Sequence, residues 1–278
     1  MRGRTYQLLA VSILALAASS TASLTVTNGF LDNTHRSVGW TVGILAGRND
    51  CDNTGQAILC SGVLIAPDVF LTTGYCAYHF HEGLDNGSIS RAYVVLDASP
   101  NIPGTVVADC SKFVAVSSVH VNPVWEANPF DGNVGVFLLS SPQTIQPAQM
   151  PKENRFKGSV THGPTPHFTL VSMGGTDLPT GTGVNFTQLH RRWAYADIPR
   201  GTVFVDVDSA TAVLEPGGLN GKTACLRDVN QGGGVFIGGT NELIGVIDAG
   251  SPCVTRGSFQ RVDTSTVRPF LEQFVTLP

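Results

Sequence analysis

Short apolar runs, separated by clusters of Gly, Pro, Asn and Asp, recur along most of the chain. They fall at residues 40–45, 62–65, 92–96, 134–139, 168–171, 203–207, 234–237 and 243–247. Runs of four to seven apolar residues bounded by turn formers are typical of short β-strands. The pattern predicts an all-β protein.

One stretch has a helical period. Val267, Phe270, Leu271 and Phe274 follow the i, i+3, i+4, i+7 rule, and the threonines and serine at 264–266 supply caps. A short helix is therefore predicted to close the chain. Residues 141–151 are rich in Pro and polar residues and show little pattern, so we interpret them as a connection between two halves, residues 24–140 and 152–278.

The first 23 residues have the pattern of a secretory signal peptide. Arg2 and Arg4 precede an apolar run at residues 8–18, and small residues follow at 19–23. A membrane span needs about 20 apolar residues, so this run is too short. We expect cleavage near Ala22 or Ser23, no membrane anchor, and a secreted, extracellular product.

Composition agrees with a globular, turn-rich protein outside the cell. Only 14% of residues are charged, 42% are hydrophobic, and there are 31 Gly and 16 Pro. The formal net charge of −4 becomes more negative without Arg2 and Arg4, which weighs against a nucleic-acid partner. All six cysteines follow the leader, and an even count in an oxidising compartment predicts three disulfides.

No cofactor or metal is predicted. A zinc site built from the cysteines would lack a close Cys-x-x-Cys pair. The segment His79-Phe-His-Glu82 would be a better metal candidate, because alternate residues of an extended loop point the same way. A polar loop beyond Cys76 explains that segment more simply.

Several motifs resemble a known pattern. The longest is Cys60-Ser-Gly-Val-Leu-Ile-Ala-Pro-Asp-Val-Phe-Leu-Thr-Thr-Gly-Tyr-Cys76. Val119-His-Val-Asn-Pro123 and Asp131-Gly-Asn-Val-Gly-Val-Phe-Leu-Leu139 follow, and then Gly232-Gly-Gly-Val-Phe236, Ile244-Gly-Val-Ile-Asp-Ala-Gly-Ser-Pro-Cys253 and Ser258-Phe-Gln-Arg-Val262. Together they resemble the chymotrypsin/trypsin-like serine proteases over most of residues 26–278. That resemblance implies two packed antiparallel β-barrels followed by a C-terminal helix.

The resemblance also implies where the catalytic triad would lie. The imidazole position holds Tyr75, the carboxylate position Asn133 and the nucleophile position Gln231. A phenol keeps its proton at neutral pH, and neither carboxamide supplies a charge or a nucleophile. The resemblance therefore predicts a degenerate triad with no catalytic residue.

Two other registers are open. Moving the carboxylate segment by two residues offers Asp131, at the cost of the match at 134–139. Counting without gaps from Cys225 puts Asp228 and Val229 in the nucleophile loop, whereas anchoring on the glycine pair gives Gln231, which we prefer because glycine permits a tight turn. Neither register of that loop supplies a hydroxyl.

An unpaired carboxylate beneath the former imidazole would be costly, and Asn133 removes that charge. Tyr75, Asn133 and Gln231 are neutral and able to hydrogen bond, so we expect them to fill the site as a satisfied polar cluster.

Activation and specificity features differ from the family as well. Val26-Thr-Asn-Gly29 resembles its Ile-Val-Asn-Gly start, but Leu24-Thr25 precedes it where activation needs Arg or Lys. The specificity pocket would hold Thr223, and its Ser-Trp-Gly wall is Asp248-Ala-Gly250. Asp248 is either a new buried binding acid or, as we prefer, a solvated or backbone-bonded carboxylate at a strand end.

The family pattern pairs Cys60 with Cys76 and Cys225 with Cys253, which leaves Cys51 for Cys110. Asn86 and Asn185 lie in glycosylation acceptor patterns. The tryptophans are expected in the core, with Trp193, beside Arg191 and Arg192, as a candidate for a binding surface.

The leading hypothesis is a secreted, inactive protease homologue that binds a protein, such as a protease, a protease inhibitor or a peptide, and that is a monomer by default. One alternative is an active serine endopeptidase with displaced residues, drawing on Asp131 or Asp228 and on His79, His81 or His120. A third is an extracellular carbohydrate-binding or adhesion module, which would show an exposed aromatic patch.

Overall fold

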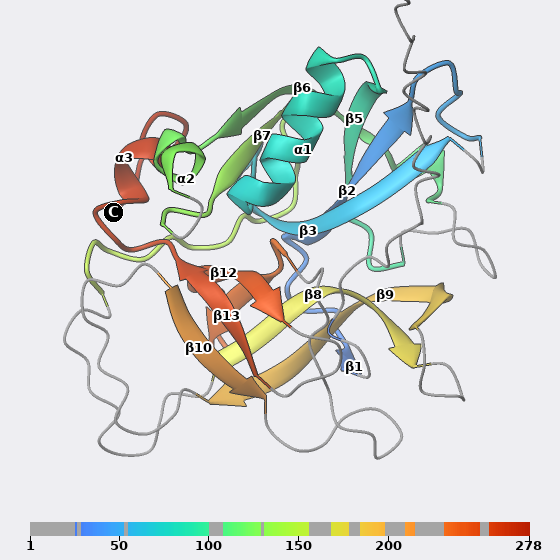
Figure 1. Ribbon diagram of the computed structural model, residues 1–278. Coiled ribbons are helices and arrows are strands. Elements are labelled where there is room, and N and C mark those ends of the chain that lie inside the picture. The colour runs from blue at the N-terminus through green and yellow to red at the C-terminus, as the bar shows by residue number, and fades with distance from the viewer. Residues whose placement is uncertain are drawn as a thin grey trace, which may run out of the picture.

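The computed structural model describes residues 26, 29–52, 55–99, 108–128, 131–155, 168–177, 184–197, 209–214, 231–250 and 256–278. Two β-barrels make up the molecule, one above the other in Figure 1, with the helices gathered on the upper barrel and beside it. Residues 1–23, predicted as a signal peptide, lie outside the described residues.

The first barrel is closed and antiparallel. Its strands are β2 (Val38–Leu45), β3 (Gln56–Ala66), β4 (Val69–Thr72), β5 (Ile89–Val95), β6 (Val114–Val121) and β7 (Gly135–Leu139). They follow the order β2-β3-β4-β7-β6-β5, and pairing of β5 with β2 closes the ring. Phe70, Val94 and Phe137 project into its interior core, where each is fully buried.

The second barrel uses the later strands. They are β8 (Phe168–Asp177), β9 (Val184–Asp197), β10 (Ser209–Leu214), β11 (Gly234–Ile237), β12 (Leu243–Gly250) and β13 (Arg256–Arg261). The order β9-β10-β13-β12-β11-β8 closes on itself because β8 also pairs with β9. A short strand, β1 (Phe30–Leu31), adds to β9, so the start of the chain joins the second sheet.

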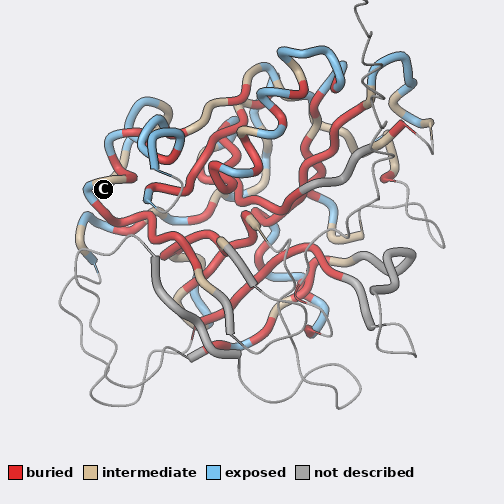
Figure 2. The backbone as a smooth tube through the Cα atoms, viewed as in Figure 1, coloured by how far each residue is buried: buried red, intermediate tan, exposed pale blue. Residues whose placement is uncertain are grey.

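One apolar core joins the two barrels. Val63 and Leu71 of the first barrel share a buried cluster with Val171 and Val246 of the second. The C-terminal helix α3 (Arg268–Leu271) adds Leu271 to that cluster. Figure 2 shows buried residues running along the strands where the two barrels meet. The predicted all-β architecture with a short terminal helix is confirmed.

A helix occupies the segment after β4, where the sequence predicts a polar loop. Helix α1 (Gly74–Asp85) begins after Thr73, whose Oγ1 accepts the Cys76 N–H at 3.3 Å. Its buried face is Cys76, Ala77, Phe80 and Gly83, and Phe80 packs on Phe137. The loop prediction is wrong because Gly, Ala and Cys on this face hide the helical period.

The remaining short elements and the disulfides tie the first barrel together. Helix α2 (Pro123–Ala127) precedes β7, and the 3-10 turn η1 spans Cys110–Lys112. The predicted disulfides Cys51–Cys110 and Cys60–Cys76 are both present. Cys225 and Cys253 lie outside the described residues.

Most strand predictions overlap observed strands, and residues 234–237 coincide with β11. The predicted strand at 203–207 lies outside the described residues. Within the described part of the chain, no helix is long and apolar enough to cross a membrane.

Candidate functional site

The residues at the predicted triad positions meet around the first turn of α1. Tyr75 is the second residue of that helix, Asn133 lies two residues before β7, and Gln231 lies three residues before β11. Asp248, of the predicted pocket wall, reaches the same place from β12. Elements of both barrels therefore build the site.

Asn133 is at its centre, buried and bonded through every polar group on its side chain. Its Oδ1 accepts the backbone N–H of Tyr75 at 3.1 Å, and its Nδ2 donates to Asp248 Oδ1. Its backbone N–H donates to Gln260 Oε1 at 2.9 Å. These bonds fix the amide in one orientation.

Asp248 brings a carboxyl group to the site that the sequence predicts to be free of charge. Its Oδ2 accepts a hydrogen bond from Ser258 Oγ at 3.4 Å. Burial raises the pKa of Asp248, and the hydrogen bonds from Asn133 and Ser258 only partly offset that rise. Asp248 is half-buried, its two observed partners are side chains, and it lies inside β12 instead of at the end of that strand.

The Tyr75 side chain turns away from this cluster. It is 41% exposed, and its ring packs edge-on against His79 with the centroids 4.3 Å apart. Only its backbone N–H reaches Asn133. The expected single cluster of three neutral side chains therefore does not form.

Gln231 lies on the other side of the helix start. Its Oε1 accepts a hydrogen bond from Thr73 Oγ1 at 3.4 Å, and its carbonyl accepts the Ser61 N–H at 3.0 Å. Gln231 thus contacts Thr73, the residue that directly precedes α1. Thr223, Asp228 and Val229 lie outside the described residues.

The turn after Gln231 requires glycine. Gly232 has a φ of +89°, and a Cβ there would lie 2.0 Å from Ser61 O and 2.3 Å from Thr72 Oγ1. Its N–H donates to Ile247 O at 2.7 Å. The turn therefore packs between the two barrels, and this packing holds Gln231 against the first barrel.

Comparison with solved structures identifies this architecture. A structure described as HL collagenase superposes with a TM-score of 0.57 and 16% sequence identity, over 89% of this chain and 97% of that one. The fold is that of the trypsin-like proteases. No family model matches the chain, and no curated protein matches it. At this identity the likeness establishes the fold alone.

Those residues of the displaced-site hypothesis that the structure describes do not assemble into one site. His81 Nε2 lies 3.5 Å from Asp85 Oδ2 on the surface of α1, and Asp131 accepts a hydrogen bond from Asn128 Nδ2 at 2.7 Å. His79 packs on Tyr75 and Tyr78. Asp228 lies outside the described residues.

His120 comes nearest to a catalytic pair. Its Nε2 lies 2.9 Å from Ser118 Oγ, and burial followed by the nearby charge of His81 lowers the pKa of His120. Its ring also contacts Phe274. Among the described residues no carboxylate bonds to this ring, so the group that orients the imidazole in a triad is missing.

The metal candidate also changes. His79 and Glu82 lie on α1 instead of an extended loop, and the described residues contain no group of three His, Cys, Asp or Glu side chains that could hold a metal ion. Asn86 is exposed at the end of α1, and its side chain accepts the Ser88 N–H. Asn185 and Gly250 lie in β9 and β12 respectively.

The alternative of a binding surface at Trp193, Arg191 and Arg192 is not supported by the positions of the two arginines. Both are buried, at 3% and 2% exposure, so they do not flank a surface Trp193. Trp193 is half-buried and packs against Phe30 and Tyr195, whereas Trp40 and Trp125 are buried as expected.

An aromatic surface borders the site. Tyr75, Tyr78 and His79 of α1 and Val124 of α2 form it, with the buried Trp125 packed against Tyr78, and we name it the α1–α2 rim. Tyr78 packs on both His79 and Trp125, with ring centroids 5.7 and 5.8 Å apart. Tyr75 and Val124 are the exposed large apolar side chains of this group. Sequence reasoning missed the rim because it depends on two helices that the strand pattern does not reveal.

Proposed function

We propose that this protein is a secreted, catalytically inactive homologue of the trypsin-like proteases that binds a protein partner at the α1–α2 rim. The observation that carries the proposal is the arrangement at the predicted triad positions. Tyr75 points to solvent, the Asn133 amide is fully bonded, and Gln231 presents a carboxamide. None of these groups is a base, a charged orienting group or a nucleophile at neutral pH.

Asp248 does not restore the chemistry. A catalytic carboxylate must orient an imidazole, whereas Asp248 bonds to the amide of Asn133 and the hydroxyl of Ser258. The two disulfides and the N-terminal leader pattern support secretion.

The charge around the rim indicates the kind of partner. Glu82 and Asp85 lie on α1, Glu126 on α2 and Asp131 just beyond it, while residues 73–88 and 122–133 contain no Lys or Arg. A hydrogen bond to Glu82, and the charges of Glu82 and Glu126, contribute to a raised pKa of Tyr78.

Exposed tyrosine rings among carboxylates suit a Lys or Arg side chain, because a cation gains from both ring faces and negative charge. Tyr and Trp are also the residues that most often dominate binding energy at interfaces. The partner is therefore a protein segment rich in Lys or Arg, such as a loop of a protease, of an inhibitor or of a peptide ligand.

One experiment addresses both catalysis and binding on the purified mature protein. A fluorophosphonate probe, read by intact mass beside an active trypsin-like protease, should leave no adduct. Two labelled peptides of equal length, one Lys/Arg-rich and one Glu/Asp-rich, are then compared. The Lys/Arg-rich peptide should bind at least about tenfold more tightly, and the difference in affinity should shrink as the salt concentration rises.

Matched variants test which surface binds the peptide and distinguish the proposed function from its two alternatives. Tyr75→Ala should lower the affinity for the basic peptide by about tenfold. Tyr195 is an exposed tyrosine of the other barrel, so Tyr195→Ala should leave that affinity unchanged. An adduct that Ser118→Ala abolishes would overturn inactivity and locate a displaced nucleophile. Binding of a neutral oligosaccharide, lost in Tyr75→Ala, in place of the basic peptide would instead favour the carbohydrate module.

A further inference from the structure

A hollow lies where the chain passes between the barrels. It has a volume of about 530 Å³ and is lined by three short segments: Thr34–Arg36 between β1 and β2, residues 144–146 of the inter-barrel connection, and residues 239–241 of the turn between β11 and β12. None of its lining residues belongs to the site around Asn133. Cavities of this size at the junction of two domains are typical places for small ligands.

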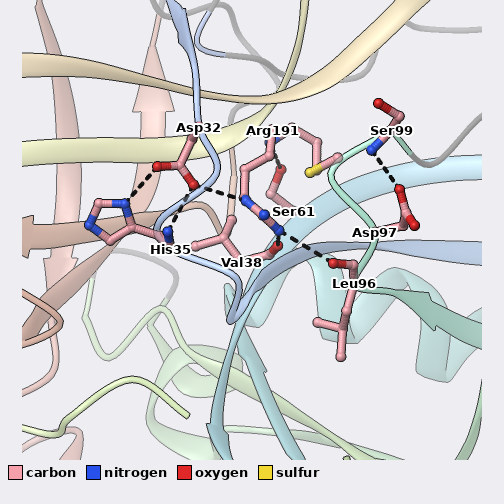
Figure 3. A network of polar contacts seen from close by, with 9 residues as sticks. Asp32, His35, Val38, Ser61, Leu96, Asp97, Ser99 and Arg191 are labelled. Carbon is pink, nitrogen blue, oxygen red and sulfur yellow. Dashed lines mark hydrogen bonds and ion pairs between the residues drawn. The ribbon is translucent and has the colours of Figure 1, made fainter. Parts of the chain in front are cut away.

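One wall of this hollow is a histidine held in a fixed orientation. His35 Nδ1 lies 2.9 Å from Asp32 Oδ1, and the His35 backbone N–H donates to Asp32 Oδ2 at 2.9 Å (Figure 3). The ring packs on Phe236 with centroids 4.6 Å apart. Nε2 lies on the side of the ring away from Asp32 in Figure 3, and His35 is one of the residues that line the hollow.

Behind the histidine, Arg191 completes a buried network. Its Nε donates to Asp32 Oδ2 at 2.9 Å, and its Nη1 donates to the carbonyls of Val38 and Leu96 at 3.1 and 3.3 Å (Figure 3). Burial would raise the pKa of Asp32, but the His35 hydrogen bond and the charges of His35 and Arg191 hold it below its usual range. An ionised carboxylate thus fixes the imidazole that faces the hollow.

The lining is polar and cationic, without an acid. Arg36 is exposed, and among the described residues it has no carboxylate partner. Glu242, the acid next to the lining residue Asn241, lies 3.5 Å from Arg155. Thr34, Thr144 and Gln146 add exposed hydroxyl and amide groups.

Part of the hollow is already rigid. Thr240 Oγ1 donates to Ile237 O at 2.8 Å, and Asn241 Nδ2 donates to Pro147 O at 2.9 Å. The lining contains no Trp, Tyr or Phe on which a flat, uncharged ligand could stack.

We propose that this hollow, named the His35 pocket, binds a small organic anion, with Arg36 donating to its phosphate, sulfate or carboxylate group and the His35 ring lining the wall beside it. A guanidinium gives the strongest and most directional hydrogen bonds to such a group. The hydroxyls and amides of Thr34, Thr144 and Gln146 contact the polar body of the ligand, because the volume exceeds what one inorganic anion fills.

The test uses the mature protein with ring-labelled histidine in NMR titrations. The probes are inorganic phosphate, sulfate and acetate, followed by glucose 6-phosphate with glucose as the uncharged comparison. We expect the anions to shift the His35 ring signals and not those of His79 or His81. We also expect glucose 6-phosphate to bind more tightly than phosphate, and glucose not to bind.

Arg36 provides the decisive variant because its exposed side chain can be replaced without disturbing the core. Arg36→Ala should weaken anion binding by at least about tenfold, the loss expected for a charge-assisted hydrogen bond, while Arg36→Lys should retain part of the affinity. Arg48→Ala, an exposed arginine of the first barrel, should bind normally. Unshifted His35 signals with every anion, equal binding of glucose and its phosphate, or full affinity in Arg36→Ala would each overturn the proposal.

Discussion

Asp32 and Asp248 are two carboxyl groups at contacts between distant segments, and their surroundings shift their pKa values in opposite directions. Asp32 is 2% exposed and meets an imidazole and a guanidinium, and its pKa is lowered. Asp248 is half-buried and meets an amide and a hydroxyl, and its pKa is raised.

The difference shows that burial alone does not decide the state of a carboxyl group. For both residues desolvation is the largest single influence, and it favours the neutral form. Cationic partners overcome it at Asp32, whereas uncharged donors at Asp248 do not. Asp248, beside Asn133, is therefore the weaker acid, and Asp32, behind His35, is the stronger one.

Removing the cation from the Asp32 network should have the largest effect on stability. Arg191→Met would leave a buried carboxylate without its guanidinium and two carbonyls without a donor, so we expect the free energy of unfolding to fall by about 3–5 kcal/mol. Denaturant titration followed by fluorescence measures it.

The control is Arg48→Met, whose arginine is half-exposed and pairs with Asp52, and which should cost less than about 0.5 kcal/mol. The double variant Asp32→Asn/Arg191→Met should recover part of the loss, because it removes the unpaired charge. A loss of the same size with and without Asp32→Asn would contradict the role assigned to the ion pair.

A second substitution places an additional carboxyl group beside Asp248 and supplies no cation to pair with it. Asn133→Asp keeps the acceptor for the Tyr75 N–H but replaces the donor to Asp248 with a carboxylate oxygen. Two carboxyl groups would then share one contact, so we expect a loss of about 2–4 kcal/mol at neutral pH that disappears when one of them is protonated.

Asn133→Asp/Asp248→Ser should restore most of that stability, since a serine hydroxyl can donate to the new carboxylate. Asn86→Asp, an exposed substitution of the same kind, should change stability by less than about 0.5 kcal/mol. If the single variant is as stable as the parent at pH 7, Asp248 and Asn133 are not in the contact described.

The sequence predicts the barrels well where the apolar pattern is uninterrupted. Residues 234–237 coincide with β11 because glycines bound, on both sides, three buried positions and one half-buried position. β9 is missed because His190, Arg191 and Arg192 break its apolar pattern, although both arginines are buried. A charged residue buried through a long-range partner carries no local signal.

The candidate site around Asn133 is likewise predictable only where the signal is local in the sequence. Motif spacing is enough to propose Tyr75, Asn133 and Gln231, because each lies next to a cysteine, a strand or a glycine pair. The contact of Asn133 with Asp248 joins residues 115 positions apart, and that of Arg191 with Asp32 joins residues 159 apart. Such partners depend on how the barrels pack, so periodicity and spacing cannot reveal them.

The smallest expected effect is the pH dependence of stability, to which Asp32 and Asp248 contribute with opposite sign. A lowered folded pKa means that Asp32 stabilises the protein above its unfolded value of 3.8, and that this contribution is lost as the pH falls through the folded pKa. A raised folded pKa means the reverse for Asp248. The folded state holds that proton more tightly, so stability falls as the pH rises from 3.8 toward the raised pKa.

Unfolding free energies measured from pH 3 to pH 8 for Asp32→Asn and Asp248→Asn therefore separate the two carboxyl groups. Asp248→Asn should gain on the parent as the pH rises above 3.8, by at most about 1.4 kcal/mol per pH unit, and then level off. Asp32→Asn should show a constant deficit above 3.8 that narrows only at lower pH. Curves that run parallel to each other would mean that the two sites ionise alike, because only opposite pKa shifts can make the two differences from the parent diverge in this way.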